Sequence, residues 1–425
     1  MILTDDEKAM LDGDRGAVVA TAMRLLVRYG DVLGADRFVD TDNVCGANVF
    51  GPKQSSVLGT TDPDALFSEF SLDSAEVLPI PPVLAHSCQL IGPMDTRRPE
   101  VQRLAAPTVR DVIANEAYSG AHGINLLSTC TPYQVGNVPV MGEHCAWMES
   151  SAVVYINSVL GARCNVEGRE SSAAAMFTGK IPYWGYHTDA FRRATFQVEV
   201  TCDVPSFQDW GVLGYFVGEM VNDAVPVLTG KVGRPTLTEL KHFGAAAATS
   251  GDVEMYHIPG TTPEARTVEE ATGGATPAHV FEFGLEQWRE TYEKLNSTGH
   301  DKDVDLVMIG CPHANLDQVR DVCRLLDGRK VRTGRALWVF TPRALREVAE
   351  RNGYGDLIRA AGGELLSDTC PAIGQFVPEG ARVFATDSAK QVHYLAPMQK
   401  VQGWFGTTAE CIDAAISGRW EGRGR

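Results

Sequence analysis

The stretch VDLVMIGCPHANLDQVRDVCRLLDG, residues 304–328, decides the fold class of this chain. Its first six residues, Val304–Ile309, form a short apolar run typical of a buried strand. The run stops at Gly310-Cys311-Pro312-His313, and Asn315 with Gln318 then forms a capping-box pattern that begins a helix. A buried strand followed directly by a capped helix predicts a βαβ unit in a parallel sheet.

The same pattern recurs toward the C-terminus. ALWVF (336–340) is followed by Thr341-Pro342 and a helical stretch, RALREVAERNG (343–353). Glu364–Leu366 leads into SDTCP (367–371), and ARVFA (381–385) precedes Thr386-Asp387-Ser388. Strands that alternate with helices predict an α/β fold with a parallel sheet.

The rest of the chain has a less regular pattern. We expect helix over the first forty residues, where Thr4 and Glu7 form a capping box, and a loop-rich region over 41–100. Residues 143–180 look like a helical core segment followed by a polar loop, and Gly244–Gly251 looks like a loop of small residues. The length suggests roughly three domains. We place them at 1–140 (α/β with a loop-rich insert), 141–280 (the polar helix–loop segment and the small-residue loop) and 281–425 (βαβ, with Cys311 and Cys370).

Composition excludes several classes of protein. Of the 425 residues, 44% are hydrophobic and 22% charged, which is typical of a globular chain with a large core. The net charge of −16 repels phosphate backbones and argues against nucleic-acid binding. The first residues, MILTDDEKAM, lack the basic and apolar stretches of a signal peptide, and no run reaches the ~18 apolar residues of a membrane span. We therefore expect a cytoplasmic protein without a membrane partner.

Ten cysteines are spread along the chain, and in a reducing compartment each is a core thiol, a nucleophile or a metal ligand. Cys323 lies on the apolar stripe of its helix, and Cys411 has a similar setting, so both fit a buried core role. Cys130, Cys311 and Cys370 differ, since each follows an apolar run and stands at or near a proline. Sites in parallel sheets form beyond the carboxyl ends of the strands. The pattern alone leaves both roles, core thiol and ligand, open for these three.

Several longer motifs resemble one known family. The segment GEHCAWMESSAVVYINSVLGARCNVEGRESSAAAMFTGK (142–180) is similar to the most characteristic stretch of the aconitase X family, large subunit. The other motifs follow in the family's order: TCTPY (129–133), LKHFGAAAATSGDVEMYHIPGTTPEA (240–265), DLVMIGCPHA (305–314), SDTCP (367–371) and ATDSAKQVHYLAP (385–397). The resemblance covers nearly the whole chain. It implies an aconitase-like fold, with parallel-sheet βαβ domains around a central iron–sulfur site.

Members of this family are dehydratases related to aconitase. The resemblance implies that Cys130, Cys311 and Cys370 bind an iron–sulfur cluster, either 2Fe-2S or 3Fe/4Fe-4S. Three thiolates leave one iron open to act as a Lewis acid on a hydroxyl or carboxylate. Cys45 is a possible extra ligand or pocket wall. It lies in TDNVCGANVFG (41–51), which departs from the family's usual histidine-containing pattern.

Polar residues supply the remaining site candidates. Glu143, His144 and Lys241 are candidate catalytic groups. Candidate substrate-binding residues are Ser150, Ser151, Arg163, Asn165, Glu167, Thr249 and Ser250. Arg163 suits a carboxylate because guanidinium binds it in a fork. The alternative is a structural network, because buried polar groups need partners, and a lysine is most often a surface charge.

Two further expectations follow from the resemblance. Aconitase-type enzymes complete their site with a mobile swivel domain that carries a catalytic serine; this chain ends in EGRGR after Trp420, which implies a separate small subunit. The run VEGRESSAAAMFTGKIPYWG (166–185) favours dehydration of cis-3-hydroxy-L-proline to Δ1-pyrroline-2-carboxylate. The heteromeric architecture favours the family's other activity, dehydration of mevalonate 5-phosphate. A non-catalytic, cluster-bearing scaffold subunit is the alternative of another class.

Overall fold

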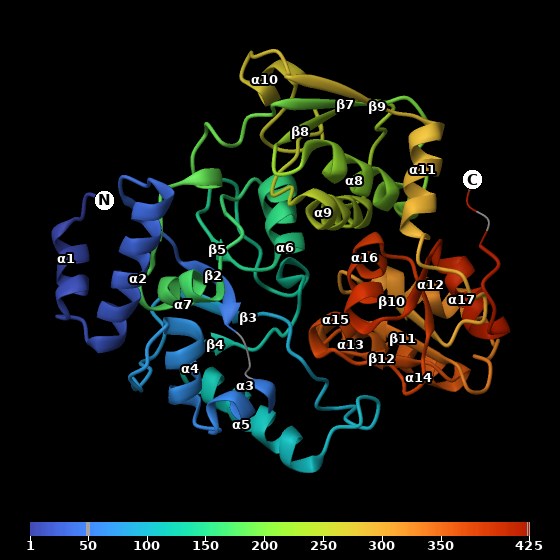
Figure 1. The fold of residues 1–425 in the computed structure, drawn as a ribbon, viewed down its shortest axis with the longest axis horizontal. Helices are drawn as coiled ribbons and strands as arrows, with labels where there is room; N and C mark the ends of the chain where they lie inside the picture. Colours follow the sequence, from blue (N-terminus) through green and yellow to red (C-terminus); the bar gives the residue numbers. More distant parts are fainter. Residues whose placement is uncertain (48–51, 423, 425) are drawn as a thin grey trace.

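The computed structural model describes residues 1–47, 52–422 and 424 of the chain (Figure 1). It confirms the α/β class and shows three groups of elements, which we call the N-terminal, middle and C-terminal modules. Each contains one all-parallel sheet, with strand orders β4-β3-β2-β5, β8-β7-β9 and β12-β11-β10-β13-β14 respectively. Among the described residues, no helix combines the length and apolar character needed to cross a bilayer.

The C-terminal module, from β10 to α17, confirms the βαβ prediction. The expected strand at 304–309 is β10, and the expected capping box is present, because the amide of Gln318 donates to Asn315 Oδ1 over 2.9 Å. The module consists of β10 (Leu306–Ile309), α12 (Leu316–Leu326), β11 (Ala336–Phe340), α13 (Arg343–Arg351), α14 (Tyr354–Ala361), β12 (Glu364–Leu366), α15 (Pro371–Gly374), β13 (Val383–Thr386), α16 (Ala389–Gln399), β14 (Gln402–Phe405) and α17 (Thr408–Ser417).

The C-terminal sheet is buried on both faces. Alternate residues of its strands enter two different apolar clusters: Val307 and Ile309 pack with α12 and α17, whereas Leu306 and Met308 pack with α16 and the middle module. A parallel sheet covered on both faces needs continuous apolar strands, which is why VDLVMI and ALWVF were recognisable in the sequence.

The N-terminal module begins with two helices, not one. The Thr4–Glu7 capping box is present in α1, but Gly13 ends that helix in a left-handed conformation before α2 begins. The module consists of α1 (Asp5–Asp12), α2 (Ala17–Leu33), β1 (Phe38–Asp40), β2 (Asn43–Ala47), α3 (Pro52–Leu58), α4 (Pro63–Leu72), β3 (His86–Gln89), α5 (Ala106–Ala121), β4 (Ile124–Asn125), η1 (Pro132–Gln134), β5 (Ala146–Trp147), α6 (Ser150–Tyr155), η2 (Ile156–Leu160), α7 (Arg169–Thr178), β6 (Lys180–Pro182) and η3 (Gly185–His187).

The loop-rich prediction for 41–100 is wrong in part, because the region holds β2, β3 and two helices. Residues 48–51, the end of the unusual TDNVCGANVFG stretch, lie outside the described residues. Strand β5 pairs with β2, so residues on both sides of position 140 share one sheet.

The middle module contains β7 (Phe196–Val200), α8 (Phe207–Val221), β8 (Pro226–Gly230), α9 (Leu237–Gly251), α10 (Val268–Thr272), β9 (His279–Phe283) and α11 (Leu285–Leu295). The loop expected at Gly244–Gly251 is wrong, because these residues lie in α9. Their small side chains let α9 pack closely on α8. A Cβ added at Gly218 would lie 2.5 Å from the carbonyl oxygen of Ala247, and one added at Gly251 would lie 1.9 Å from that of Gly218.

Candidate active site

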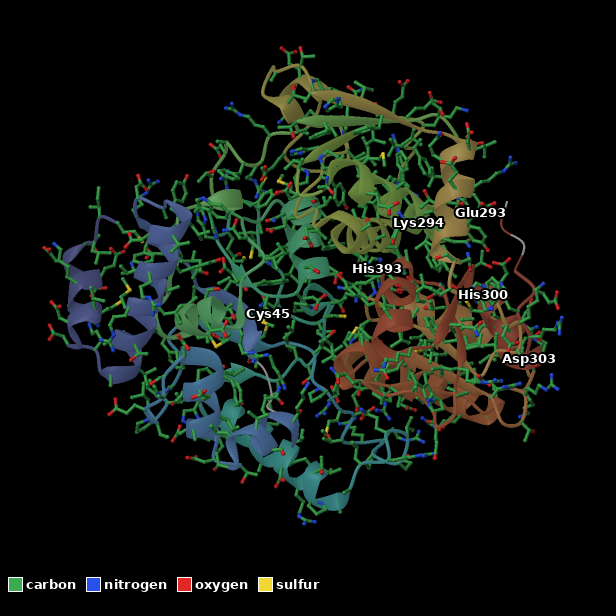
Figure 2. The ribbon with its side chains drawn as sticks, in the orientation of Figure 1. Cys45, Glu293, Lys294, His300, Asp303 and His393 are labelled. Carbon is green, nitrogen blue, oxygen red and sulfur yellow. The ribbon has the colours of Figure 1, made fainter. Side chains whose placement is uncertain are left out.

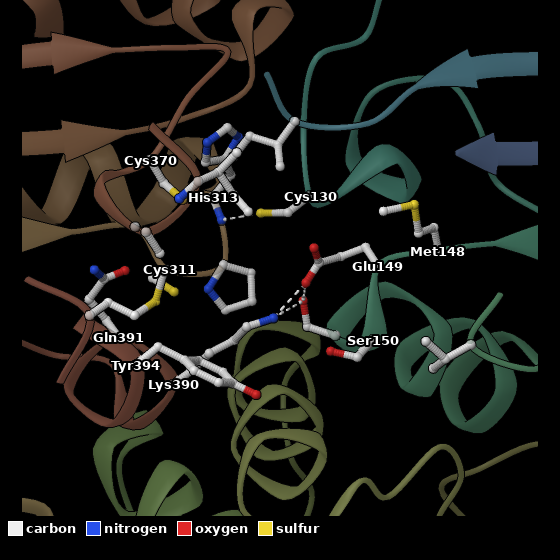
Figure 3. Close-up of a pocket in the computed structure, with 18 residues that line it drawn as sticks. Cys130, Met148, Glu149, Ser150, Cys311, His313, Cys370, Lys390, Gln391 and Tyr394 are labelled. Carbon is white, nitrogen blue, oxygen red and sulfur yellow. Dashed lines mark hydrogen bonds and ion pairs between the residues drawn. The ribbon is translucent and has the colours of Figure 1, made fainter. Parts of the chain in front are cut away.

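A cavity of about 370 Å³ lies where the N-terminal and C-terminal sheets meet (Figure 3). Residues that follow β3, β4 and β5 line one side: Ile91, Cys130 and Met148. Residues that follow β10 and β12, with the start of α16, line the other. The carboxyl ends of two parallel sheets therefore open into one space, where α/β proteins commonly place their sites.

Cys130, Cys311 and Cys370 all line this cavity and are partly exposed. Cys311 and Cys370 follow β10 and β12, two strands of the C-terminal sheet that are separated by β11, and Cys130 comes from the opposite sheet. Gly310 makes the first turn possible: its φ is +99°, and a Cβ there would lie 2.2 Å from the carbonyl oxygen of Phe340. The structure thus brings the three predicted thiols together.

The pKa of each of these three thiols is raised to about 12, mainly by burial, and Glu149 and one of the other thiols contribute to that rise. The amides of His313 and Ile373 lie 3.4 and 3.5 Å from the sulfurs of Cys130 and Cys370 and act in the opposite direction. Thiols in this setting stay protonated unless a strong positive charge binds them.

A partly buried ion pair crosses the cavity. Lys390 Nζ, on α16, donates to Glu149 Oε1 over 2.5 Å and to Ser151 Oγ over 3.2 Å; Ser151 Oγ in turn lies 2.9 Å from Glu149 Oε1 (Figure 3). Burial opposes both charges, but the ion pair outweighs it, so the pKa of Lys390 is raised and that of Glu149 is lowered. The cavity therefore holds one fixed positive and one fixed negative group side by side.

His313 joins the turns that carry the cysteines. Its Nε2 lies 3.1 Å from the carbonyl oxygen of Thr369, and its Nδ1 lies 2.9 Å from Thr129 Oγ1. Burial lowers the pKa of His313 to about 4, so the imidazole is neutral. Because a carbonyl only accepts, Nε2 carries the proton and Nδ1 accepts from the Thr129 hydroxyl.

Lys241, a predicted catalytic residue, contacts the loop that carries Cys311 and His313. Its Nζ donates to the carbonyl oxygen of His313 over 2.9 Å and to Gln318 Oε1 over 2.7 Å, and it does not line the cavity. Burial lowers its pKa to about 8. The structure gives Lys241 contacts with the cysteine-bearing loop and none with the open space.

Glu143 and His144, the other two predicted catalytic residues, border a different surface hollow. Glu143 accepts from the side-chain amide of Asn43 over 2.8 Å, and His144 Nδ1 lies 2.9 Å from His187 Nδ1. Burial lowers the pKa of His144. Neither residue is brought to the cysteines.

The predicted substrate-binding residues divide into two groups. Ser150 and Ser151 line the cavity. Arg163 does not: it donates to Asp189 Oδ1 and to the carbonyl oxygen of His187, and it lines a third hollow.

Asn165 and Glu167 are also buried away from the cavity. The side chain of Asn165 accepts from the amide of Tyr186 over 2.8 Å. Glu167 is 3% exposed, and burial raises its pKa to about 7. Neither residue lines the space between the two sheets.

Thr249 and Ser250 serve the packing of α9. Thr249 Oγ1 donates to the carbonyl oxygen of Ala245, and Ser250 Oγ donates to that of Tyr215 on α8. With their hydroxyls directed at helical carbonyls, they offer no anion-binding loop.

Cys45, the possible extra ligand, is 1% exposed on β2 and contacts Cys88 (Figure 2). It does not line the cavity. Cys323 and Cys411 are buried among apolar residues, which confirms their predicted core role.

Sequence reasoning missed Lys390, Glu149 and His313 as site residues. All three lie inside motifs that were recognised for other reasons: ATDSAKQVHYLAP, the 142–180 segment and DLVMIGCPHA. The clearest signal in the sequence was the position of Lys390 after the end of a strand. Lys390 follows the buried strand β13 and the helix cap Ser388, just as Cys370 follows β12.

Comparison with known proteins places this geometry in a family. Sequence models of the aconitase X first, second and third domains match residues 1–190, 194–293 and 304–417. The phosphomevalonate dehydratase large subunit of Methanothermobacter thermautotrophicus is 38% identical over 395 residues, which are 92% of this chain and 93% of that protein.

A second relative and a solved structure agree. The cis-3-hydroxy-L-proline dehydratase of Pseudomonas aeruginosa is 32% identical over 97% of this chain and 70% of that protein. The crystal structure of Thermococcus kodakaraensis aconitase X in its holo-form superposes with a TM-score of 0.83 at 31% identity, covering 98% of this chain and 100% of that one. Relatives of both kinds are dehydratases, that is, hydro-lyases. The chain therefore belongs to the aconitase X family.

Proposed function

We propose that this chain is the large subunit of an iron–sulfur hydro-lyase that removes water from a 3-hydroxy carboxylic acid. The observation that carries the proposal is the convergence of Cys130, Cys311 and Cys370 on one cavity, from strand ends 59 to 240 residues apart in sequence. Membership of a family of dehydratases supports the reaction class.

The three thiols suit a cluster and not a lone ion. Within residues 1–47, 52–422 and 424, no three His, Cys, Asp or Glu side chains lie close enough together to hold one metal ion. A cluster places its ligands on separate irons, and iron would supply the positive charge that these buried thiols need in order to deprotonate. The described residues lining the cavity include no fourth cysteine, so one iron would keep an open position. When bound, the cluster supplies a Lewis acid for the departing hydroxyl.

The chain's own residues would bind and orient the substrate. Lys390 is the cation that faces the cavity and is suited to a carboxylate, and Ser150 and Ser151 offer hydroxyls beside it. Removal of the Cα proton also needs a base. We assign that role to a serine of a small swivel-domain subunit, in line with relatives named as large subunits.

The charge of the cavity favours cis-3-hydroxy-L-proline as the substrate. Among the described residues that line it, Glu149 and Lys390 are the two charged side chains, and they balance each other. A zwitterion presents one carboxylate to Lys390 and one ammonium to Glu149. Apolar side chains such as Met148, Ile373 and Tyr394 suit the ring. Dehydration would give an enamine that tautomerises to Δ1-pyrroline-2-carboxylate.

Sequence similarity supports a second substrate, mevalonate 5-phosphate. A phosphomevalonate dehydratase large subunit is 38% identical to this chain, whereas the two cis-3-hydroxy-L-proline dehydratases are 32% and 31% identical. A phosphate needs more positive charge than a paired lysine offers, so the small subunit would have to supply it.

The decisive experiment is anaerobic purification of the chain together with its small subunit, followed by assays of both substrates. We expect a brown complex and water loss from one of the two hydroxy acids. Cys130→Ser, Cys311→Ser and Cys370→Ser should each lose the colour, whereas Cys323→Ser, at a buried cysteine in α12, should keep it. A coloured complex without activity would favour a scaffold subunit, and a colourless wild-type complex would overturn the proposal.

A further inference from the structure

We propose that His313 is the positioning residue of the three-cysteine site: its side chain and backbone tie together the turns that carry Cys130, Cys311 and Cys370. This inference rests on the proposed function, in which the three turns carry the ligands of one cluster. His313 itself is fully buried.

The contacts of His313 reach every one of the three turns. Its imidazole accepts from Thr129, the residue before Cys130, and donates to the carbonyl of Thr369, the residue before Cys370. Its own amide lies 3.4 Å from the sulfur of Cys130, and it stands two residues after Cys311 (Figure 3). One side chain with a donor and an acceptor on opposite ring nitrogens can bridge two turns in this way.

The middle module holds the backbone of His313 through a hydrogen bond. Lys241, on α9, donates to the carbonyl oxygen of His313, which also accepts from the side-chain amide of Gln134 over 3.1 Å. Lys241 is 2% exposed, and Gln318 holds its other hydrogen bond. All three modules therefore meet at His313, and the amino group of Lys241 lies behind the loop that carries Cys311 and His313.

Outer groups that orient metal ligands typically change metal affinity 10- to 100-fold when they are removed. The two imidazole bonds can be tested separately. His313→Asn keeps a polar atom near Nδ1 and so retains the bond with Thr129, whereas His313→Gln retains the bond with Thr369. Thr129→Val removes the first bond and leaves the histidine in place.

The first readout uses the cluster-free chain and needs no activity. We expect iodoacetamide to label Cys130 several-fold faster in His313→Gln and Thr129→Val, and Cys370 several-fold faster in His313→Asn, with Cys323 as the internal reference. His257→Gln is the matched control, since His257 is also buried and bonds a backbone carbonyl, that of Arg192, away from the cysteines. Unchanged labelling of Cys130 and Cys370, or equal acceleration of every cysteine, would overturn the proposal.

The second readout uses the loaded complex. Each His313 variant should lose its cluster about 10- to 100-fold faster under a chelator. Lys241→Met should shift the cluster's midpoint potential to more negative values, because the reduced cluster loses a nearby positive charge. If the wild-type chain binds no cluster, the proposed function fails, while the thiol-labelling pattern still decides the role of His313.

Discussion

At the scale of single residues, the site contains two partly buried charges that are paired with each other. Lys390 and Glu149 stabilise each other 2.5 Å apart, and each would be costly to bury alone. The pair therefore suits the zwitterionic substrate that we propose, and its removal should affect binding more than folding if both members are neutralised together.

We predict that Lys390→Met lowers kcat/KM by roughly 10- to 150-fold, because a hydrogen bond to a charged group contributes about 1.5–3 kcal/mol. The loss should appear mainly as a higher KM if Lys390 binds the substrate carboxylate in the ground state. Steady-state kinetics of the complex would measure it. Lys294→Met, at an exposed lysine on α11, is the control, and the double variant Glu149→Gln/Lys390→Met separates binding from the cost of an unpaired carboxylate.

Glu167 gives a prediction on pH. Burial raises its pKa from 4.5 to about 7, against smaller opposing effects from Ser171, Tyr29 and Asn165. Between those two values the folded chain binds more protons than the unfolded chain, so this group's contribution to stability falls as pH rises through 7. Glu167→Gln should therefore gain, relative to wild type, roughly 1–3 kcal/mol of unfolding free energy between pH 5 and pH 8. Denaturant melts at both pH values would show it, and the exposed Glu170→Gln should show no such difference.

At the scale of elements, close helix packing explains a motif that the sequence alone misrepresented. The run Gly244–Gly251 lacks large side chains and looks like a loop, yet it is the half of α9 that approaches α8. Small residues permit both a flexible loop and a tight helix contact, and only the partner helix distinguishes the two.

We predict that Gly218→Ala lowers the unfolding free energy by about 1–3 kcal/mol, because its Cβ would meet backbone atoms of α9. Gly120→Ala in α5 is the matched control. Its Cβ would make an ordinary 3.5 Å contact with Leu126, and alanine favours a helix over glycine by about 0.5–1 kcal/mol. Urea denaturation of both variants would test the pair. Equal effects would mean that α8 and α9 do not pack as described.

The elements of the fold also differ in how well the sequence predicts them. Strands β10, β11 and β12 were recognisable because a sheet covered on both faces requires continuous apolar runs. Strands β3 and β4 were harder to see, being short and interrupted by polar residues such as Ser87 and Asn125. The cysteines were identified from their strand-end positions together with a family resemblance. Arg163 and His144 were not separable from site residues by sequence, because a buried polar network and a binding site use the same residue types.

At the scale of the whole molecule, the N-terminal and C-terminal modules are joined beside the cavity by a buried ion pair. Asp95 accepts from Arg346 on α13 over 2.9 Å and from the amide of Ser367, which leads into the Cys370 turn. Asp95 is fully buried. This contact holds the N-terminal and C-terminal sides of the cavity together.

We predict that Asp95→Asn lowers the unfolding free energy by roughly 3–5 kcal/mol, because it leaves the buried Arg346 with only the more distant Glu350, 3.9 Å from its Nε, as a counter-charge. Glu347→Gln tests the exposed neighbour in the same interface, where Glu347 pairs with Arg97 in solvent and should contribute little. Thermal melts would compare them. A small effect of Asp95→Asn would mean that the modules are held together elsewhere.

The division of the thiols between two modules has a consequence for biosynthesis. Cys130 is translated long before Cys311 and Cys370, and its sheet shares no strand with theirs. A cluster bound by all three thiols, as we propose, therefore could not be completed during synthesis of the chain. Its insertion would have to wait until the two modules have docked, so maturation machinery would encounter a chain whose tertiary structure is already complete.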